Sequence, residues 1–121
     1  MMNDPSSFPE PTIEISSPAE GTVLVALGGE HDLSSARDVE QALTESLQAG
    51  SHLIVNISDT QFLDSSTISA LVRAKNAADA AGKRFNLVLG TAAIVERALE
   101  VSGVMPMLDV VPSVESALVP V

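Results

Sequence analysis

Residues 62–72 read Phe62-Leu63-Asp64-Ser65-Ser66-Thr67-Ile68-Ser69-Ala70-Leu71-Val72. Aspartate and serine are favoured at the N-cap of a helix, and the apolar residues that follow recur at helical spacing. The pattern predicts that a loop ends here and that an amphipathic helix begins. A hydroxyl at this place faces solvent and lies at the positive end of the helix dipole, so it is suited to accept a phosphoryl group.

Strand and helix signals alternate on the N-terminal side of this segment. Residues 12–16 and 22–28 are predicted to form an antiparallel hairpin, closed by a turn at residues 18–21. A helix capped by Ser34 or Ser35 is expected to follow and to end at Gly50. Residues 52–57 are a nearly continuous run of apolar and β-branched side chains, which is typical of the central strand of a parallel sheet.

The alternation continues on the C-terminal side. The helix after Asp64 is expected to end at Gly82, and residues 85–89 are predicted to form the next strand. Thr91 is expected to cap a third helix that ends near Gly103, followed by an edge strand at residues 107–111 and a short amphipathic tail at residues 114–119. The order ββαβαβαβ, with a short C-terminal helix, predicts an α/β fold: a mostly parallel mixed sheet with helices packed on it.

Length and composition limit the organisation of the chain. Its 121 residues, 45% of them hydrophobic, suffice for one core and are too few for two. Residues 1–11 are rich in proline and serine and predict a flexible arm. We therefore expect one domain over residues 12–119.

The charge excludes several kinds of partner. The formal net charge is −10, with only six lysines and arginines, so the chain would repel nucleic acid and anionic lipid. Cysteine is absent, which removes disulfides and thiolate chemistry. There is no signal-peptide pattern and no apolar run long enough to span a bilayer. We expect a soluble, cytoplasmic protein without direct contact to DNA, RNA or membrane.

Three segments together resemble the STAS domain of bacterial anti-sigma factor antagonists. They are Gly29-Glu30-His31-Asp32-Leu33-Ser34-Ser35-Ala36, Leu53-Ile54-Val55-Asn56-Ile57 and Phe62-Leu63-Asp64-Ser65-Ser66. The resemblance covers nearly the whole chain, from residue 12 to residue 119. It implies the same fold class as the pattern of strands and helices.

The resemblance also implies a function without catalysis. In this family the serine after the aspartate is phosphorylated by an ATP-binding anti-sigma factor that is also a serine kinase, and this serine corresponds to Ser65. The unphosphorylated antagonist binds the anti-sigma factor and frees the sigma factor. A metal-dependent serine phosphatase restores the unphosphorylated form, so transcription is controlled indirectly, and no cofactor or metal is implied.

Ser65 is thus the expected phosphorylation site, with Ser66 and Thr67 as alternatives. Ser65 and Ser66 could equally serve as helix caps, and Asp64 could be only a favourable charge at the helix start. Asp32 is either a second cap or a contact for the partner. We expect a docking surface, partly apolar, near the serine. Its residues are Asp32, Leu33, Ser34, Ser35, Phe62, Leu63, Asp64, Ser66 and Thr67.

Three further residues have to be weighed. His31 is expected to be a partly exposed loop histidine, and His52 a residue at the edge of a strand. Thr67 stands where many relatives have glycine, so its side chain is expected to fill space that the glycine leaves open for the kinase's nucleotide or backbone.

Enzymatic activity is not expected. The chain lacks the glycines of a nucleophile elbow and the glycine-rich loops that bind nucleotides. Its two histidines lie without an acidic cluster beside them, which is a weak signal for a metal site. Two alternatives use the same fold: a scaffold or sensor in a stress-signalling complex, and an accessory subunit of a lipid or anion transporter.

Overall fold

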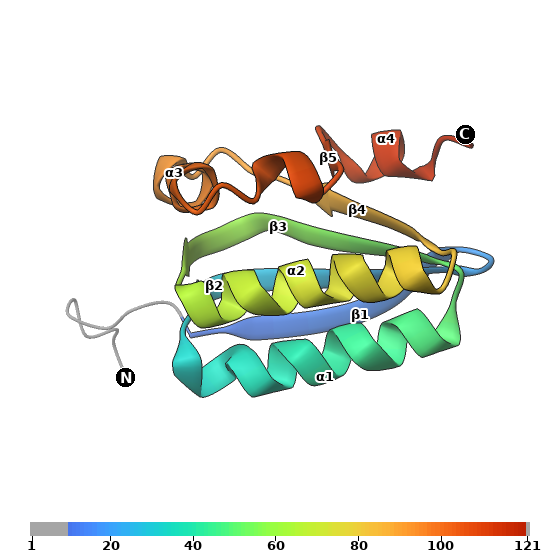
Figure 1. Ribbon diagram of the computed structural model, residues 1–121, viewed down its shortest axis with the longest axis horizontal. Coiled ribbons are helices and arrows are strands. Elements are labelled where there is room, and N and C mark those ends of the chain that lie inside the picture. Colours follow the sequence, from blue (N-terminus) through green and yellow to red (C-terminus); the bar gives the residue numbers. More distant parts are fainter. Residues whose placement is uncertain (1–9, 121) are drawn as a thin grey trace, which may run out of the picture.

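Five strands form one mixed sheet in the computed structural model, which describes residues 10–120 (Figure 1). The strands lie in the order β1-β2-β3-β4-β5. β1 is antiparallel to β2, and the other neighbouring pairs are parallel. The elements are β1 (Thr12–Ala19), β2 (Thr22–His31), α1 (Leu33–Ala49), β3 (His52–Leu63), α2 (Ser65–Ala80), β4 (Arg84–Val88), α3 (Ala93–Val101), a 3₁₀ turn η1 (Met105–Met107), β5 (Val110–Val111) and α4 (Val114–Leu118).

The central strand β3 has different neighbours on its two faces. Leu53, Val55 and Ile57 belong to the main core together with residues of α1, α2 and α3. Ile54 points to the other face, because side chains alternate along a strand, and there it packs with Ala117 of α4. The main core is therefore sandwiched between the sheet and the pair α1 and α2, which run side by side (Figure 1).

Two irregularities lengthen β3 beyond the apolar run. The pairing with β2 shifts register between Ala26 and Gly28 and again between Gly29 and Glu30, so that β3 has an additional residue at each place. Ser58 and Asp59 are exposed at the first irregularity, and the Thr60 hydroxyl donates a 2.7 Å hydrogen bond to the carbonyl oxygen of Leu27. The strand thereby continues to Leu63 and ends directly at Asp64.

The predicted fold class is confirmed, and so is the order of the main elements. The predicted loop before Asp64 is wrong, because Phe62 and Leu63 belong to β3, which pairs with β2 up to that point. Thr91 does not cap α3: the cap is Ala92, which has no side-chain acceptor. The last predicted strand is reduced to Val110–Val111, since Met105–Met107 form a 3₁₀ turn. Residues 1–9 of the predicted arm lie outside the described residues.

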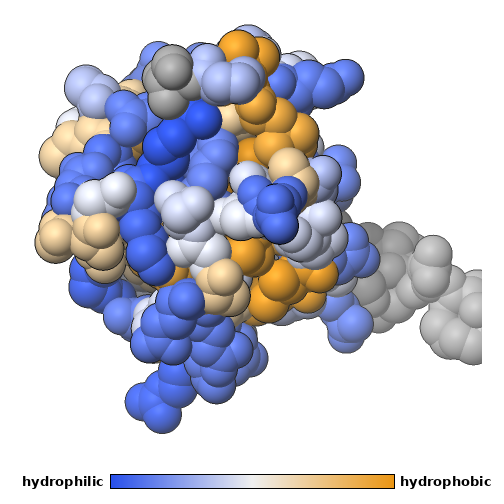
Figure 2. Space-filling view, turned by 90° about the vertical axis from the view of Figure 1, so that its right-hand side faces the viewer, coloured by the Kyte–Doolittle hydropathy of each residue, from blue (hydrophilic) through white to orange (hydrophobic). Residues whose placement is uncertain are grey.

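The candidate site lies at only one of the two ends of the domain. α1 and α2 both begin at one end, where the predicted site lies, and both finish at the other (Figure 1). Figure 2 shows this second end, which hydrophilic residues cover for the most part, with smaller hydrophobic patches between them.

Replacing Leu71 by alanine should destabilise the domain by about 2–5 kcal/mol, because its fully buried side chain would leave a cavity between α2 and the sheet. Leu33→Ala is the matched control: Leu33 is 76% exposed, so the same change should stay within about 0.5 kcal/mol. Chemical denaturation of both variants measures the difference. Equal losses would contradict the assignment of Leu71 to the core.

Candidate functional site

The site forms where the parallel strands β2 and β3 end beside each other. His31, the last residue of β2, pairs with Leu63, the last residue of β3. The backbone N–H of Asp64 then donates a 3.1 Å hydrogen bond to the carbonyl oxygen of His31. Because α1 and α2 follow after a single residue each, their N-termini are held side by side at this end of the sheet (Figure 1).

Asp64 is the N-cap of α2. Its Oδ1 accepts hydrogen bonds from the Ser66 hydroxyl at 2.6 Å and from the Thr67 backbone N–H at 3.1 Å. Burial raises the pKa of this carboxyl, but the hydrogen bonds from Ser66 and Thr67 outweigh that effect and leave the pKa below its ordinary value. Asp64 therefore stays ionised at neutral pH and fixes the first turn of the helix.

Asp32 caps α1 with nearly the same geometry. Its Oδ1 accepts from the Ser34 hydroxyl at 2.6 Å and from the Ser34 backbone N–H at 2.9 Å. The hydrogen bond from the Ser34 side chain is the main cause that lowers the pKa of Asp32. The cap of this helix is thus Asp32 and neither of the two serines that the sequence suggested.

The three candidate phosphoacceptors have different environments. Ser65 is the first residue of α2, is exposed, and makes no side-chain hydrogen bond within residues 10–120. Ser66 is half-buried, and its hydroxyl is bound to Asp64. Thr67 is fully buried. The cap is Asp64, so the alternative role of Ser65 and Ser66 as the helix cap is wrong.

Ser65 and Ser66 each line a different surface groove. Ser65 borders a hollow of about 440 Å³ between α2 and the segment after α3, which Ser102 and Val104 close. Ser66 borders a second hollow of about 530 Å³ between α1 and α2, which includes Leu33 and Arg37. The start of α2 is therefore a ridge with a groove on either side.

The predicted docking residues separate into accessible and buried ones. Asp32, Leu33 and Ser34 are exposed, while Phe62 is half-buried. Leu63 and Ser35 are buried, because one side chain points into the core and the other beneath the start of α1. The predicted apolar surface thus contains Leu33 and part of Phe62; the expectation that Leu63, Ser35 and Thr67 lie on it is wrong.

His31 is fully buried, which corrects the expectation of a partly exposed loop residue. It ends β2, and its Nδ1 lies 3.0 Å from the Ser35 hydroxyl. Burial lowers the pKa of His31, and nearby backbone carbonyls of Thr12 and Gly28 oppose the shift only in part. The residue joins β2 to the first turn of α1 and stays neutral at neutral pH.

His52 begins β3, as expected, but its side chain is buried. Its Nε2 lies 2.8 Å from Oδ1 of Asn86, and burial lowers its pKa. It stands at the opposite end of β3 from Leu63, so it takes no part in the site.

Thr67 also departs from expectation. Its side chain is enclosed by the protein, with Oγ1 3.4 Å from Oδ1 of Asp64. The expectation that it fills space open to a partner is wrong, because the side chain points inward and supports the cap.

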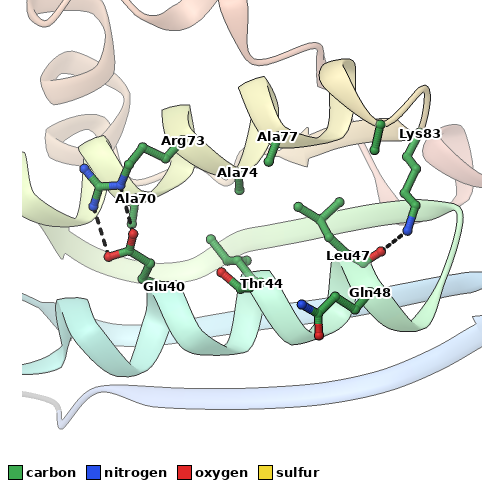
Figure 3. A pocket seen from close by; sticks show the side chains of 11 residues that line it. Glu40, Thr44, Leu47, Gln48, Ala70, Arg73, Ala74, Ala77 and Lys83 are labelled. Carbon is green, nitrogen blue, oxygen red and sulfur yellow. Dashed lines mark hydrogen bonds and ion pairs between the residues drawn. The ribbon is translucent and has the colours of Figure 1, made fainter.

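A third groove separates α1 from α2 beyond the site (Figure 3). Its volume is about 410 Å³, and the floor is formed by Leu43 and Leu47 together with the alanines of α2. Arg73 closes it at one end: its Nε and Nη2 donate to the Glu40 carboxylate at 2.9 and 3.1 Å. At the other end Lys83 donates to the carbonyl oxygen of Leu47.

Sequence reasoning missed several residues around Ser65. Ser69 and Arg73 lie one and two turns further along α2 and line the same grooves as the serines. Their i+4 and i+8 spacing from Ser65 was a usable signal. Ser102 and Val104 come from a distant segment, and nothing local in the sequence indicates their proximity.

Within residues 10–120, histidine, aspartate and glutamate form no group of three or more that could hold a metal ion. The same part of the chain contains no helix with the length and apolarity that crossing a membrane requires.

The STAS domain family model matches residues 14–117, and the chain belongs to this family. Among solved structures, it resembles an anti-sigma factor antagonist from Mycobacterium paratuberculosis, with a TM-score of 0.73 and 23% identity, over 97% of this chain and 96% of that one. It also resembles a putative anti-sigma factor antagonist from Thermotoga maritima, with a TM-score of 0.75 and 15% identity over 88% and 91% of the two chains.

A third relative in structure is the anti-sigma factor antagonist SpoIIAA, from Bacillus. Its unphosphorylated form has a TM-score of 0.73 at 20% identity, over 88% of this chain and 93% of that chain. Its phosphorylated form has a TM-score of 0.66 at 19% identity, over 88% and 96%. These likenesses establish the shared fold. A search of curated protein sequences gives no match.

The two caps should contribute to stability in the same way. Asp64→Ala removes the acceptor for the Thr67 N–H and should cost about 1 kcal/mol, whereas Asp64→Asn keeps an acceptor oxygen and should cost much less. Asp32→Ala and Asp32→Asn form the matched pair at α1. Urea denaturation measures all four variants. A loss as large for asparagine as for alanine would contradict the capping role.

The buried histidines should make the domain acid-sensitive. The folded pKa values of His31 and His52 lie below the ordinary value of 6.5, so between the two values the unfolded chain binds more protons. Their contribution to stability is therefore complete above pH 6.5 and falls as the pH drops below it. The free energy of unfolding should decrease over this window, and His31→Gln should show a smaller decrease than the parent chain. An unchanged slope in this variant would contradict the burial of a neutral imidazole.

Proposed function

We propose that this protein is an anti-sigma factor antagonist whose binding to its partner is controlled by phosphorylation of Ser65. The observation that carries the proposal is the geometry at the start of α2: Ser65 is exposed with a free hydroxyl, while Ser66 is tied to Asp64 and Thr67 is buried. Membership in the STAS family and the likeness to several antagonists support it.

The position of Ser65 suits a reversible phosphate. A phosphoserine carries a charge of about −1.5 to −2 at neutral pH, and the dipole of a helix stabilises negative charge in the first turn. The fold should therefore survive the modification. SpoIIAA, which shares this fold, has been described in both phosphorylated and unphosphorylated forms.

The same phosphate would disfavour docking. It would lie beside the ionised carboxylate of Asp64, on a ridge whose other side borders the groove that holds the exposed, apolar Leu33. A partner that covers this ridge would have to desolvate two adjacent negative charges, which is costly unless both are paired. Binding would then be lost although the fold is unchanged.

The proposed partners follow from this chemistry. An ATP-binding anti-sigma factor with serine kinase activity binds the unphosphorylated ridge and transfers the phosphoryl group to Ser65. A metal-dependent serine phosphatase reverses the step. The protein itself supplies no catalytic group, acts in the cytoplasm and controls transcription through its partner.

The test combines a pull-down from the host cytosol with an ATP phosphotransfer assay and mapping of the modified residue by mass spectrometry. The unphosphorylated chain should retain an ATP-binding kinase that modifies Ser65 and then dissociates. Ser65→Ala should abolish phosphate incorporation and bind constitutively. Ser65→Asp should weaken binding about tenfold or more, through the added charge at the ridge.

Two matched controls locate the effect. Ser66→Ala should still be phosphorylated at Ser65. Ser34→Ala removes the counterpart of Ser66 on α1 and leaves the phosphoacceptor Ser65 unchanged, so this variant should be phosphorylated as well. Modification of Ser66 in place of Ser65, or equal affinity of Ser65→Ala and Ser65→Asp, would overturn the proposal. Recovery of scaffold or transporter proteins with Ser65 unmodified would leave the fold and remove the phosphorylation switch.

A further inference from the structure

β1 forms an open edge of the sheet. In the sheet that residues 10–120 form, it has β2 on one side and no strand on the other. Thr12 to Ser16 pair regularly with residues of β2. The backbone N–H and C=O groups of this stretch that do not point towards β2 therefore face outward. The register shift beyond Ser16 and the hydrogen bonds of the Ser17 hydroxyl to Ala19 and Thr22 close the hairpin, so the regular edge is one short strand long.

The surroundings of this edge are acidic. Residues 10–36 contain five aspartates and glutamates and no lysine or arginine. Glu10, Glu14 and Glu20 on or beside β1 are all exposed. Asp38 and Glu45 of α1 are exposed as well and do not line the groove against α2.

The basic side chains that form ion pairs or hydrogen bonds do so elsewhere in the domain. Arg73 binds Glu40 in the groove between α1 and α2, and Lys75 binds Asp79 and Asp109. Arg84 donates to the carbonyl oxygen of Ala117 on α4. Within residues 10–120, none of the ion pairs or hydrogen bonds that lysine and arginine side chains make involves a residue of β1.

The two faces of the edge have different chemistry. Thr12, Glu14 and Ser16 share one face, because side chains alternate along a strand. Ile13 and Ile15 share the other; Ile13 packs against the main core, and Ile15 is 54% exposed. The edge thus offers a carboxylate on one face and an apolar side chain on the other.

We infer that β1 binds an extended, basic segment of a partner protein, which adds to the sheet as a further strand. Backbone hydrogen bonds to the edge would provide the affinity, as in other cases of strand addition. Lysine or arginine side chains would lie across from Glu14, and an apolar side chain would cover Ile15. This surface is separate from the ridge at Ser65 and does not depend on the function proposed there.

A second copy of this chain fits the same edge poorly. Antiparallel self-pairing centred on Glu14 places two carboxylates directly opposite each other. Pairing centred on Ile15 instead brings the acidic surroundings of the two edges, which include Glu10 and Glu20, towards each other. Since this part of the chain has no basic residue to compensate, a foreign basic strand is the better complement.

The probe is the peptide acetyl-Lys-Val-Lys-Val-Lys-Val-Lys-amide, titrated into the ¹⁵N-labelled full chain and followed by NMR. The largest shifts should occur at the backbone amides of Thr12 to Ser16. A peptide of the same sequence and charge that is N-methylated at every residue has no backbone N–H along the strand to donate, and it should lose this binding. Glu14→Lys should weaken binding about fivefold or more, through the reversed charge beside the added strand.

Glu100→Lys is the control variant, because it changes the net charge equally on the exposed surface of α3. It should bind the peptide nearly as well as the parent chain does. Three results would overturn the inference: equal binding of the N-methylated peptide, shifts spread over the surface without preference for β1, or equal weakening by Glu100→Lys. A dimer that forms through β1 and excludes the peptide would also overturn it, by assigning the edge to a second copy.

Discussion

The hydrogen bond from the Asp64 backbone N–H to the carbonyl oxygen of His31 joins the two halves of the candidate site. It extends the pairing of β2 and β3 by one step beyond their last residues. Because α1 and α2 each begin after a single capping residue, this bond determines where both helices start. The positions of Ser65 and Leu33 relative to each other follow from it.

Much of the fold could be predicted from the sequence, since strands such as 52–57 and the helices after Asp32 and Asp64 carry strong periodic signals. The end of β3 could not. Polar residues 58–61 interrupt the apolar run, and the two register shifts that keep this stretch in the sheet arise from pairing with β2, which no local pattern reveals. The predicted cap of α3 was wrong for a related reason. Thr91 has a side chain suited to capping, but the helix begins at Ala93, so Ala92 and not Thr91 occupies the N-cap position.

The site itself was predicted in part. The sequence indicated Asp64 and Ser65 together, because a cap and the first helical residue are local features. The sequence could not indicate which of the side chains around these two residues are exposed and which are buried. Leu33 and Leu63 are both leucines next to capping aspartates, yet Leu33 opens a helix facing solvent and Leu63 ends a strand facing the core. His31 shows the same limit, since burial depends on α1 and β1 packing around the end of β2.

The similarity of the two caps suggests how one end of the domain can act as a switch. At each helix an aspartate accepts from the hydroxyl two residues on and leaves the intervening side chain free. That free residue is Leu33 on α1 and Ser65 on α2, so an apolar contact and a modifiable hydroxyl are presented on equivalent, rigidly capped positions. A phosphate added at Ser65 therefore has no cap to break and no core to disturb. Its effect would fall on the exposed ridge at the start of α2, where a change of charge can alter binding most while altering the fold least.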